Sequence, residues 1–169
     1  MSTPISKALI RTIVPAGDKV TTCCNSKSFV RNNAAGENRY ICINNDCKNK
    51  NEEAILIVPS GVQVTKYKIR PLSPVERGRL IDESASVAIN TSESGTKMHE
   101  LVKYWVKVGL TGWENFEASF ATAEESVLGL PSRQVLTDAA YNELPYEDTL
   151  DIAFAVRNYN RLSDDESKN

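Results

Sequence analysis

The hydrophobic pattern of this chain changes its period at Pro71, and this change restricts the possible folds more than any other feature. Before Pro71, apolar residues come in short, β-branched runs separated by Pro, Gly and Asn, a pattern typical of short strands joined by turns. After it, apolar residues recur every three or four positions, as in amphipathic helices. The sequence therefore predicts an α+β protein: a small antiparallel β-rich module at residues 1–70, followed by an α-helical module at residues 71–169.

The first part contains five predicted strands. Their residue ranges are 8–14, 19–24, 39–43, 54–58 and 62–69, and the range 54–58 is a nearly continuous apolar run. Five short strands within about 60 residues favour a small antiparallel sheet or barrel.

The second part opens with a helix-start signature. Ser73 is placed to cap the helix, Pro74 fits the first helical position, and Glu76 can reach back to the N–H of the cap. The sequence thus predicts a helix from Pro74, preceded by an extended segment at residues 68–72 because Pro71 disfavours helical geometry at Arg70.

Further helices are predicted along the rest of the chain. One is capped at Thr96 and ends at Gly109, and we expect a turn punctuated by glycines to follow it. The others are expected at residues 123–128, from 131 or 132 to 144, and from 147 to about 162.

Charge divides the chain as the hydrophobic period does. Residues 1–70 hold 11 Lys and Arg against 5 Asp and Glu, whereas residues 71–169 hold 9 against 17. The acidic second part argues against a nucleic-acid site there. The basic first part either attracts the acidic part or offers a face to a partner. One such face, for nucleic acid, would combine basic residues with aromatic rings for stacking. Its members would be Arg11, Lys19, Lys27, Phe29, Arg31, Arg39 and Tyr40.

The four cysteines are the candidate metal ligands. Cys42 and Cys47 flank a predicted turn and can form one knuckle of a tetrahedral zinc site. Cys23 and Cys24 are adjacent, and neighbours on a strand point to opposite faces, so they make a poor second pair. Three interpretations stay open: a structural zinc site, reduced thiols, or an oxidised pair.

We expect no enzymatic activity. His99 is the only histidine, so a triad-type site would have to use it, and the chain shows neither a nucleophile motif nor a phosphate-binding glycine pattern. Three aromatic residues, Trp105, Trp113 and Phe116, are instead candidates for binding a partner, because Trp is favoured at binding hot spots. The alternative interpretation places these aromatic side chains in the core.

Three segments together resemble a small family of tailed-bacteriophage proteins described as tail assembly chaperones. They are residues 68–77 (KIRPLSPVER), 109–116 (GLTGWENF) and 160–169 (NRLSDDESKN), and the resemblance covers roughly residues 64–169. It implies a non-enzymatic phage morphogenesis protein of the host cytoplasm that binds the tape-measure protein or tail-tube components. It leaves residues 1–60, with their cysteines, without an explanation.

Two other functions remain possible at this stage. One is a virion structural protein, or a tail or head completion protein. The other is a zinc-containing regulator that binds nucleic acid or a polymerase. No apolar run approaches the roughly 20 residues that a membrane-spanning helix needs, so no membrane partner is expected. The sequence does not predict an oligomeric state.

Overall fold

A computed structural model describes residues 10–32, 39–89 and 94–166 of the chain. In chain order the strands and helices are β1 (Arg11–Ile13), η2 (Ala16–Asp18), β2 (Val20–Thr21), β3 (Phe29–Asn32), β4 (Arg39–Cys42), β5 (Leu56–Ile57), β6 (Lys66–Ile69), α1 (Pro74–Ile89), α2 (Ser94–Gly109), β7 (Leu110–Glu114), β8 (Thr122–Glu125), β9 (Arg133–Leu136), α3 (Asp138–Asn142) and α4 (Tyr146–Glu166). Small antiparallel sheets lie mostly in the first half and the helices in the second, which confirms the predicted α+β class.

The largest sheet of the described residues joins both parts of the chain. Its strand order is β1-β6-β7, with both pairs antiparallel. The expected glycine-punctuated turn after Gly109 is therefore wrong. Residues 110–114 continue as a strand because Tyr67 and Lys68 of β6 pair with Trp113 and Gly112. The division of the chain at residue 70 remains a prediction, although this sheet takes strands from both sides of it.

The helix start at Ser73 is confirmed in detail. The amide of Ser73 donates to Glu76 Oε2 at 2.6 Å, and the amide of Glu76 donates to Ser73 Oγ at 3.3 Å, which is a capping box. The next helix begins at Ser94, two residues before the predicted cap at Thr96. The polar residues 90–95 predict a loop before this helix; residues 90–93 lie outside the described residues, and Ser94 and Gly95 belong to α2.

Residues 122–142 differ most from the sequence-based expectation. The helices predicted at 123–128 and from 131 or 132 are wrong: β8 and β9 form an antiparallel hairpin, and the helix α3 begins only at Asp138. Thr137 caps that helix by accepting from the amide of Ala140 at 3.1 Å. The turn of the hairpin contains Leu128 and Gly129, both with positive φ, a conformation that a helix would not allow.

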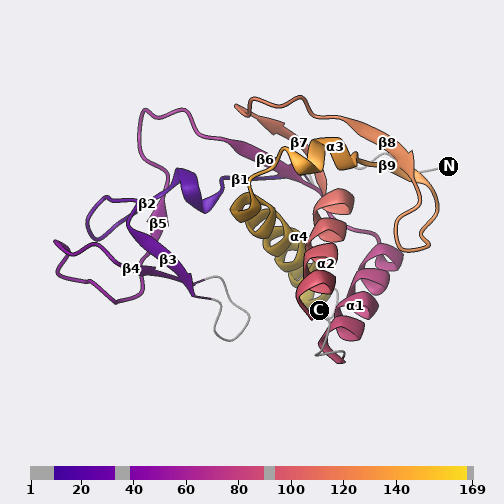
Figure 1. The fold of residues 1–169 in the computed structure, drawn as a ribbon, viewed down its shortest axis with the longest axis horizontal. Coiled ribbons are helices and arrows are strands. Elements are labelled where there is room, and N and C mark those ends of the chain that lie inside the picture. The colour runs from indigo at the N-terminus through magenta and orange to yellow at the C-terminus, as the bar shows by residue number, and fades with distance from the viewer. Residues whose placement is uncertain (1–9, 33–38, 90–93, 167–169) are drawn as a thin grey trace.

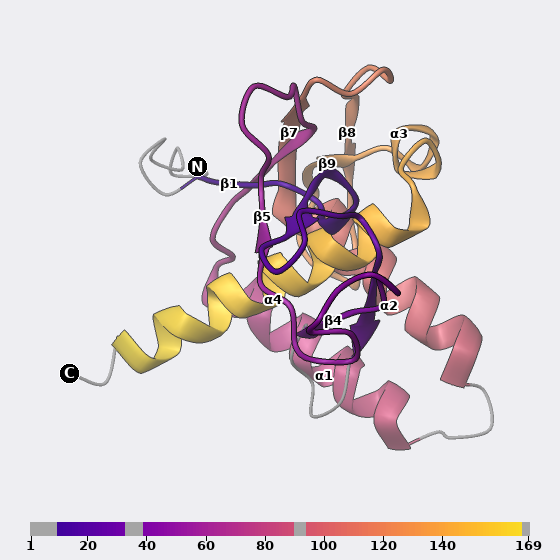
Figure 2. The same ribbon diagram turned by 90° about the vertical axis from the view of Figure 1, so that its left-hand side faces the viewer.

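One hydrophobic core holds α1, α2, α4 and two of the sheets together, and we call this unit the helical body. Its fully buried members include Tyr67, Leu80, Val106, Leu136 and Ile152. α2 and α4 pack directly on each other and fill the centre of the unit (Figures 1 and 2).

A second, much smaller unit extends from the helical body, and we call it the cysteine module. It comprises the described residues between 19 and 58, with β2 paired to β5 and β3 paired to β4 (Figure 1). Its own apolar cluster contains only three buried residues, Cys42, Cys47 and Ala54, with Cys24 partly buried against them. A unit this small needs more than that core, because modules of around 40 residues usually rely on metals or disulfides for stability.

Candidate metal centre

Cys23 and Cys24 lie in a tight turn that follows β2. The amide of Asn25 donates to Thr21 O at 2.8 Å, and Asn25 has a φ of 50°. Asn tolerates this left-handed conformation better than most residues. The expectation that the two cysteines face opposite ways assumed a strand over 19–24. It is wrong because β2 ends at Thr21, and in the turn both thiols are directed to the same side.

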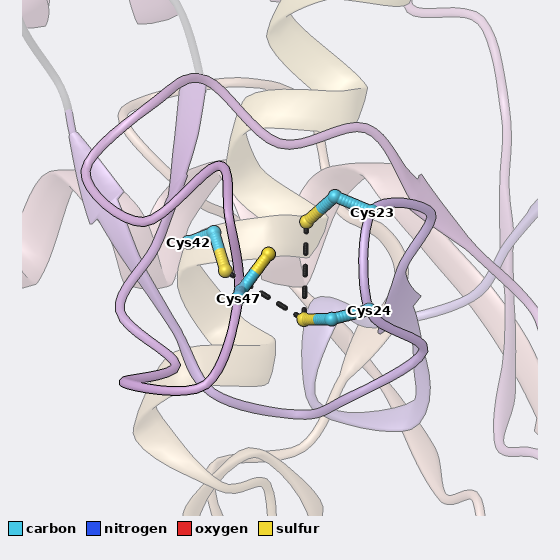
Figure 3. Close-up of side chains that lie close together, drawn as sticks. All are labelled: Cys23, Cys24, Cys42 and Cys47. Carbon is cyan, nitrogen blue, oxygen red and sulfur yellow. Dashed lines mark hydrogen bonds between the residues drawn. The ribbon is translucent and has the colours of Figure 1, made fainter.

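Cys42 and Cys47 lie at the end of β4 and in the loop that follows it. The amide of Cys47 donates to Asn44 O at 3.1 Å, and the amide of Asn51 donates to Cys42 O at 2.7 Å. These bonds close the loop upon itself, so that both sulfur atoms point towards the turn that carries Cys23 and Cys24 (Figure 3). The knuckle predicted from the spacing of Cys42 and Cys47 is therefore present.

The four sulfur atoms lie close enough together to share one metal ion. All lie within 4.8 Å of one another. Cys24 Sγ is 3.8 Å from Cys23 Sγ and 3.7 Å from Cys42 Sγ (Figure 3). A zinc ion with Zn–S bonds of about 2.3 Å in a tetrahedron requires its sulfur ligands to be about 3.8 Å apart. The four cysteines can therefore hold a metal ion, and they are free thiols.

Hydrogen-bond donors converge on Cys24. The hydroxyl oxygens of Ser26 and Thr21 lie 3.3 and 3.2 Å from its sulfur, and the side-chain amide of Asn44 donates to it at 3.5 Å. Ser26 first, then Thr21, lowers the pKa of the Cys24 thiol to about 6, and burial acts in the opposite direction. This environment favours a thiolate, which is the form that binds metals.

The thiols of Cys42 and Cys47 each accept a backbone N–H, from Asn44 and Asn49 respectively. Each of these bonds lowers the pKa of its thiol. Burial and the thiols of Cys23 and Cys24 outweigh them, so the pKa of Cys42 is raised and that of Cys47 rises to about 12. The cluster thus supports one thiolate readily and resists more negative charge. A divalent cation at its centre would remove that resistance, since a coordinating thiol is deprotonated outright.

The cysteine module is fastened to the helical body at Asp151 of α4. Its carboxylate accepts three hydrogen bonds: from the amide of Ala16 at 2.7 Å, from Arg31 Nη2 at 2.7 Å and from Tyr40 Oη at 3.2 Å. Burial first, then the charge of Asp151, raises the pKa of Tyr40 to about 12, so this phenol keeps its proton.

The opposite side of the module carries an aliphatic face. Val30 pairs with Ile41 across the β3–β4 hairpin, and Ile41 in turn bridges to Glu53. Side chains alternate along extended chain, so residues two and four positions beyond Glu53 lie on the same side. The aliphatic face consists of the exposed residues Val30, Ile43, Ile55 and Ile57 and the half-buried Ile41, and Ile55 is 70% exposed. Only two residues of the predicted strand 54–58, Leu56 and Ile57, form a ladder.

The three aromatic candidates for partner binding lie in or against the core. Trp105 is 6% exposed, so the structure favours the core interpretation for this residue. Trp113 and Phe116 are partly buried, with ring centroids 5.2 Å apart, and Trp113 Nε1 donates to Ala118 O at 2.7 Å. A role in partner binding remains a prediction for them. His99 lies against the rings of Tyr141 and Tyr146.

The residues proposed for a basic nucleic-acid surface do not share a face. Arg31 and Tyr40 turn inward to Asp151. Arg11 instead lies over the ring of Tyr159, 3.9 Å from its centroid, on the helical body. The sequence did not single out Asp151 as part of any site. Nothing local marks it, because its partners come from positions 111 to 135 residues away.

Comparisons with family models, curated proteins and solved structures found no match. Among the described residues, no helix has the length and apolar character needed to cross a membrane.

Proposed function

We propose that Cys23, Cys24, Cys42 and Cys47 bind one structural Zn²⁺, and that the protein acts by binding another protein without catalysis. The mutual approach of the four sulfur atoms to within 4.8 Å carries the first half of this proposal. Four thiolates in a closed tetrahedron suit Zn²⁺, or iron in a sulfur site, and leave no open position for a substrate. The ion would supply the stability that a core of three buried residues cannot.

Metal analysis tests the zinc site directly. Protein purified without added metal should contain about one zinc per chain and little iron, and Co²⁺ exchange should give the absorption of a tetrahedral tetrathiolate complex. Cys42→Ser should lose most of the metal, because Cys42 is a buried ligand. Lys48→Ser, an exposed change in the same loop, should retain it. Metal-free wild-type protein with ordered β3 and β4 would rule the site out.

The aliphatic face supports the second half of the proposal. It exposes β-branched side chains on three segments of the cysteine module, and exposed apolar surface of this kind marks interaction sites. Arg39 and Glu53, paired at 3.7 Å, border the face with one charge of each sign. Such a border matches an apolar protein surface better than a phosphate backbone, which favours a uniformly basic surface. The partner we propose is therefore a protein.

The resemblance to tail assembly chaperones covers residues 64–169 and not the aliphatic face, but it suggests the class of partner that the whole protein binds. We propose a tape-measure or tail-tube protein. Co-expression with the tape-measure protein and affinity capture should recover a complex. Ile55→Glu should reduce capture at least about tenfold, because a charge would be buried in the contact. Ile81→Glu on α1 is the matched control, since Ile81 is also more than half exposed. Equal capture of both variants would contradict the proposed face.

A further inference from the structure

Asp151 connects the candidate metal site to the helical body through a single hairpin. The register of β3 and β4 places Arg31 opposite Tyr40 and Phe29 opposite Cys42. Because strand side chains alternate, these four lie on one side of the hairpin. That side therefore carries a metal ligand, Cys42, at one end and the two side chains bonded to Asp151 at the other.

Along β4, the metal ligand Cys42 and the Asp151 partner Tyr40 are only two residues apart. Between them, the rings of Phe29 and Tyr40 meet edge to face, with centroids 5.6 Å apart. A two-stranded hairpin with four paired positions is marginally stable by itself in water. Its geometry is fixed from outside at three places: by residues 51–54, whose backbone bonds to Tyr40 and Cys42 of β4, by the cysteine cluster and by Asp151.

Metal binding at the cysteine cluster and contact with Asp151 both restrict the β3–β4 hairpin. Once one of them is in place, the other has less conformational freedom of the hairpin to remove. Metal bound to Cys42 would hold β4 in place, so Tyr40 and Arg31 would lose less entropy when they meet Asp151. The converse holds by thermodynamic necessity, since coupling between two binding events is reciprocal. The pairing of Arg31 with Asp151 is also sensitive to docking, because both side chains are 11% exposed and an unpaired buried charge is costly.

We propose that Asp151 is a positioning residue for the metal site, so that metal binding and the docking of the cysteine module on α4 strengthen each other. This inference rests on the proposed zinc site. Asp151 itself touches none of the four sulfur atoms through any described interaction. Its influence on the metal would act only through the β3–β4 hairpin.

Electrostatics alone predicts the opposite effect of removing Asp151. Binding Zn²⁺ to four thiols with release of their protons leaves a cluster of net charge −2. A nearby carboxylate disfavours that charge, and Arg31, left with Glu147 at 3.5 Å as its only described carboxylate partner, would favour it more. Asp151→Asn should therefore tighten metal binding if charge decided the outcome, and weaken it if the hairpin transmits the effect. The sign of the change separates the two mechanisms.

The test measures zinc affinity by competition with a chromophoric chelator in the full-length protein. Asp151→Asn should weaken affinity by at least about fivefold, the lower end of typical coupling between sites. Tyr40→Phe, a milder change that removes one bond to Asp151, should weaken it about three- to tenfold. Tyr67→Phe is the matched control: it also removes a bond to a carboxylate of α4, Asp148 at 2.5 Å, but from the helical body. Its effect should stay within about twofold.

A second readout follows the junction itself. The amide of Ala16, which lies three residues before the cysteine module, donates to Asp151, so its hydrogen exchange reports whether this carboxylate is held in place and involves no thiol. Adding zinc to metal-free wild-type protein should slow this exchange, and should not slow it in Asp151→Asn. Zinc affinities unchanged or tightened in both Asp151→Asn and Tyr40→Phe would overturn the inference while the zinc site stands. A wild-type protein that binds no zinc would overturn both.

Discussion

Glu76 is the most completely buried charged side chain described in the helical body, with 0% of its surface exposed. Burial by itself would raise its pKa. The hydrogen bond from Arg70, the amide of Ser73 and the positive charges of Arg70 and Arg133 outweigh burial and hold the pKa below its usual range. Arg70 Nη1 donates to Glu76 Oε2 at 3.1 Å, and Arg133 Nη1 bonds to Oε1. Glu76 thereby joins the helix start to β9.

Replacing Glu76 tests this network through its pH dependence. Glu76→Gln should lower the free energy of unfolding by about 3 kcal/mol at pH 7, because it leaves two guanidinium groups without their counter-charge. A depressed folded-state pKa contributes stability above the unfolded value of about 4.3, and that contribution is lost as the pH falls through the folded-state pKa. Urea unfolding of both proteins at pH 7 and pH 3 measures the difference.

The difference between wild type and Glu76→Gln should therefore shrink towards pH 3. Glu100→Gln, an exposed change on α2, serves as the control and should cost less than about 0.5 kcal/mol at either pH. A loss in Glu76→Gln of equal size at both pH values would show that the ionised carboxylate contributes nothing specific.

Individual residues were predictable where their partners lie close in sequence. Ser73 and Glu76 form the expected capping box because the motif is three residues long and complete in itself. The pairing of Cys42 with Cys47 follows from a short loop in the same way. Strand alternation predicts that Cys23 and Cys24 diverge, and it fails here because Asn25 turns the chain.

Among the elements, α2 and α4 approach each other closely at Gly109. A Cβ atom at this position would lie 2.5 Å from both Cγ1 and Cγ2 of Val156, which is fully buried. Val156 has a branched side chain held by the surrounding core, so neither methyl group can move aside without displacing a neighbour. The glycine is required here by the contact between the helices rather than by its backbone angles.

Gly109→Ala should therefore destabilise the protein by about 1–3 kcal/mol, the usual cost of overpacking a core. Gly78→Ala on α1 provides a control of opposite sign. A Cβ there meets nothing within 4 Å, so the change should stabilise the helix by about 1 kcal/mol. Urea denaturation midpoints of the two variants give the comparison. A stabilised Gly109→Ala variant would mean that α4 can shift away from α2.

The sequence of β9 and α3 is compatible with both the helical period of 3.6 residues and the strand period of two. Val135, Leu136, Ala139 and Ala140 suit a helical stripe, but Val135 and Leu136 belong to β9 and only the alanines lie in or beside α3. Both strand residues are buried because β9 is covered by α2 and by neighbouring strands. Such burial on both faces removes the alternation that normally reveals a strand. The packing between distant segments decided the outcome, and sequence periodicity does not record it.

For the molecule as a whole, the change of period at Pro71 was sufficient to predict the α+β class. It was not sufficient to predict the three-stranded sheet, because β7 comes from the part expected to be helical. Asp151 and the aliphatic face were equally inaccessible to sequence reasoning. The role of Asp151 depends on contacts between residues more than 100 positions apart. The aliphatic face depends on the register of β3 with β4 and on the bridge of Ile41 to Glu53.

The pairing of β1 with β6 also determines how the cysteine module is attached. Ile13 and Tyr67 are direct partners in the ladder, so the segment between them leaves this sheet after β1 and rejoins it at the neighbouring strand β6. The module is thus topologically an insertion into a hairpin, and a short turn joining β1 to β6 would leave every strand order of the helical body unchanged. A chain built in this way can gain, lose or exchange the cysteine module without redesigning the scaffold that carries it.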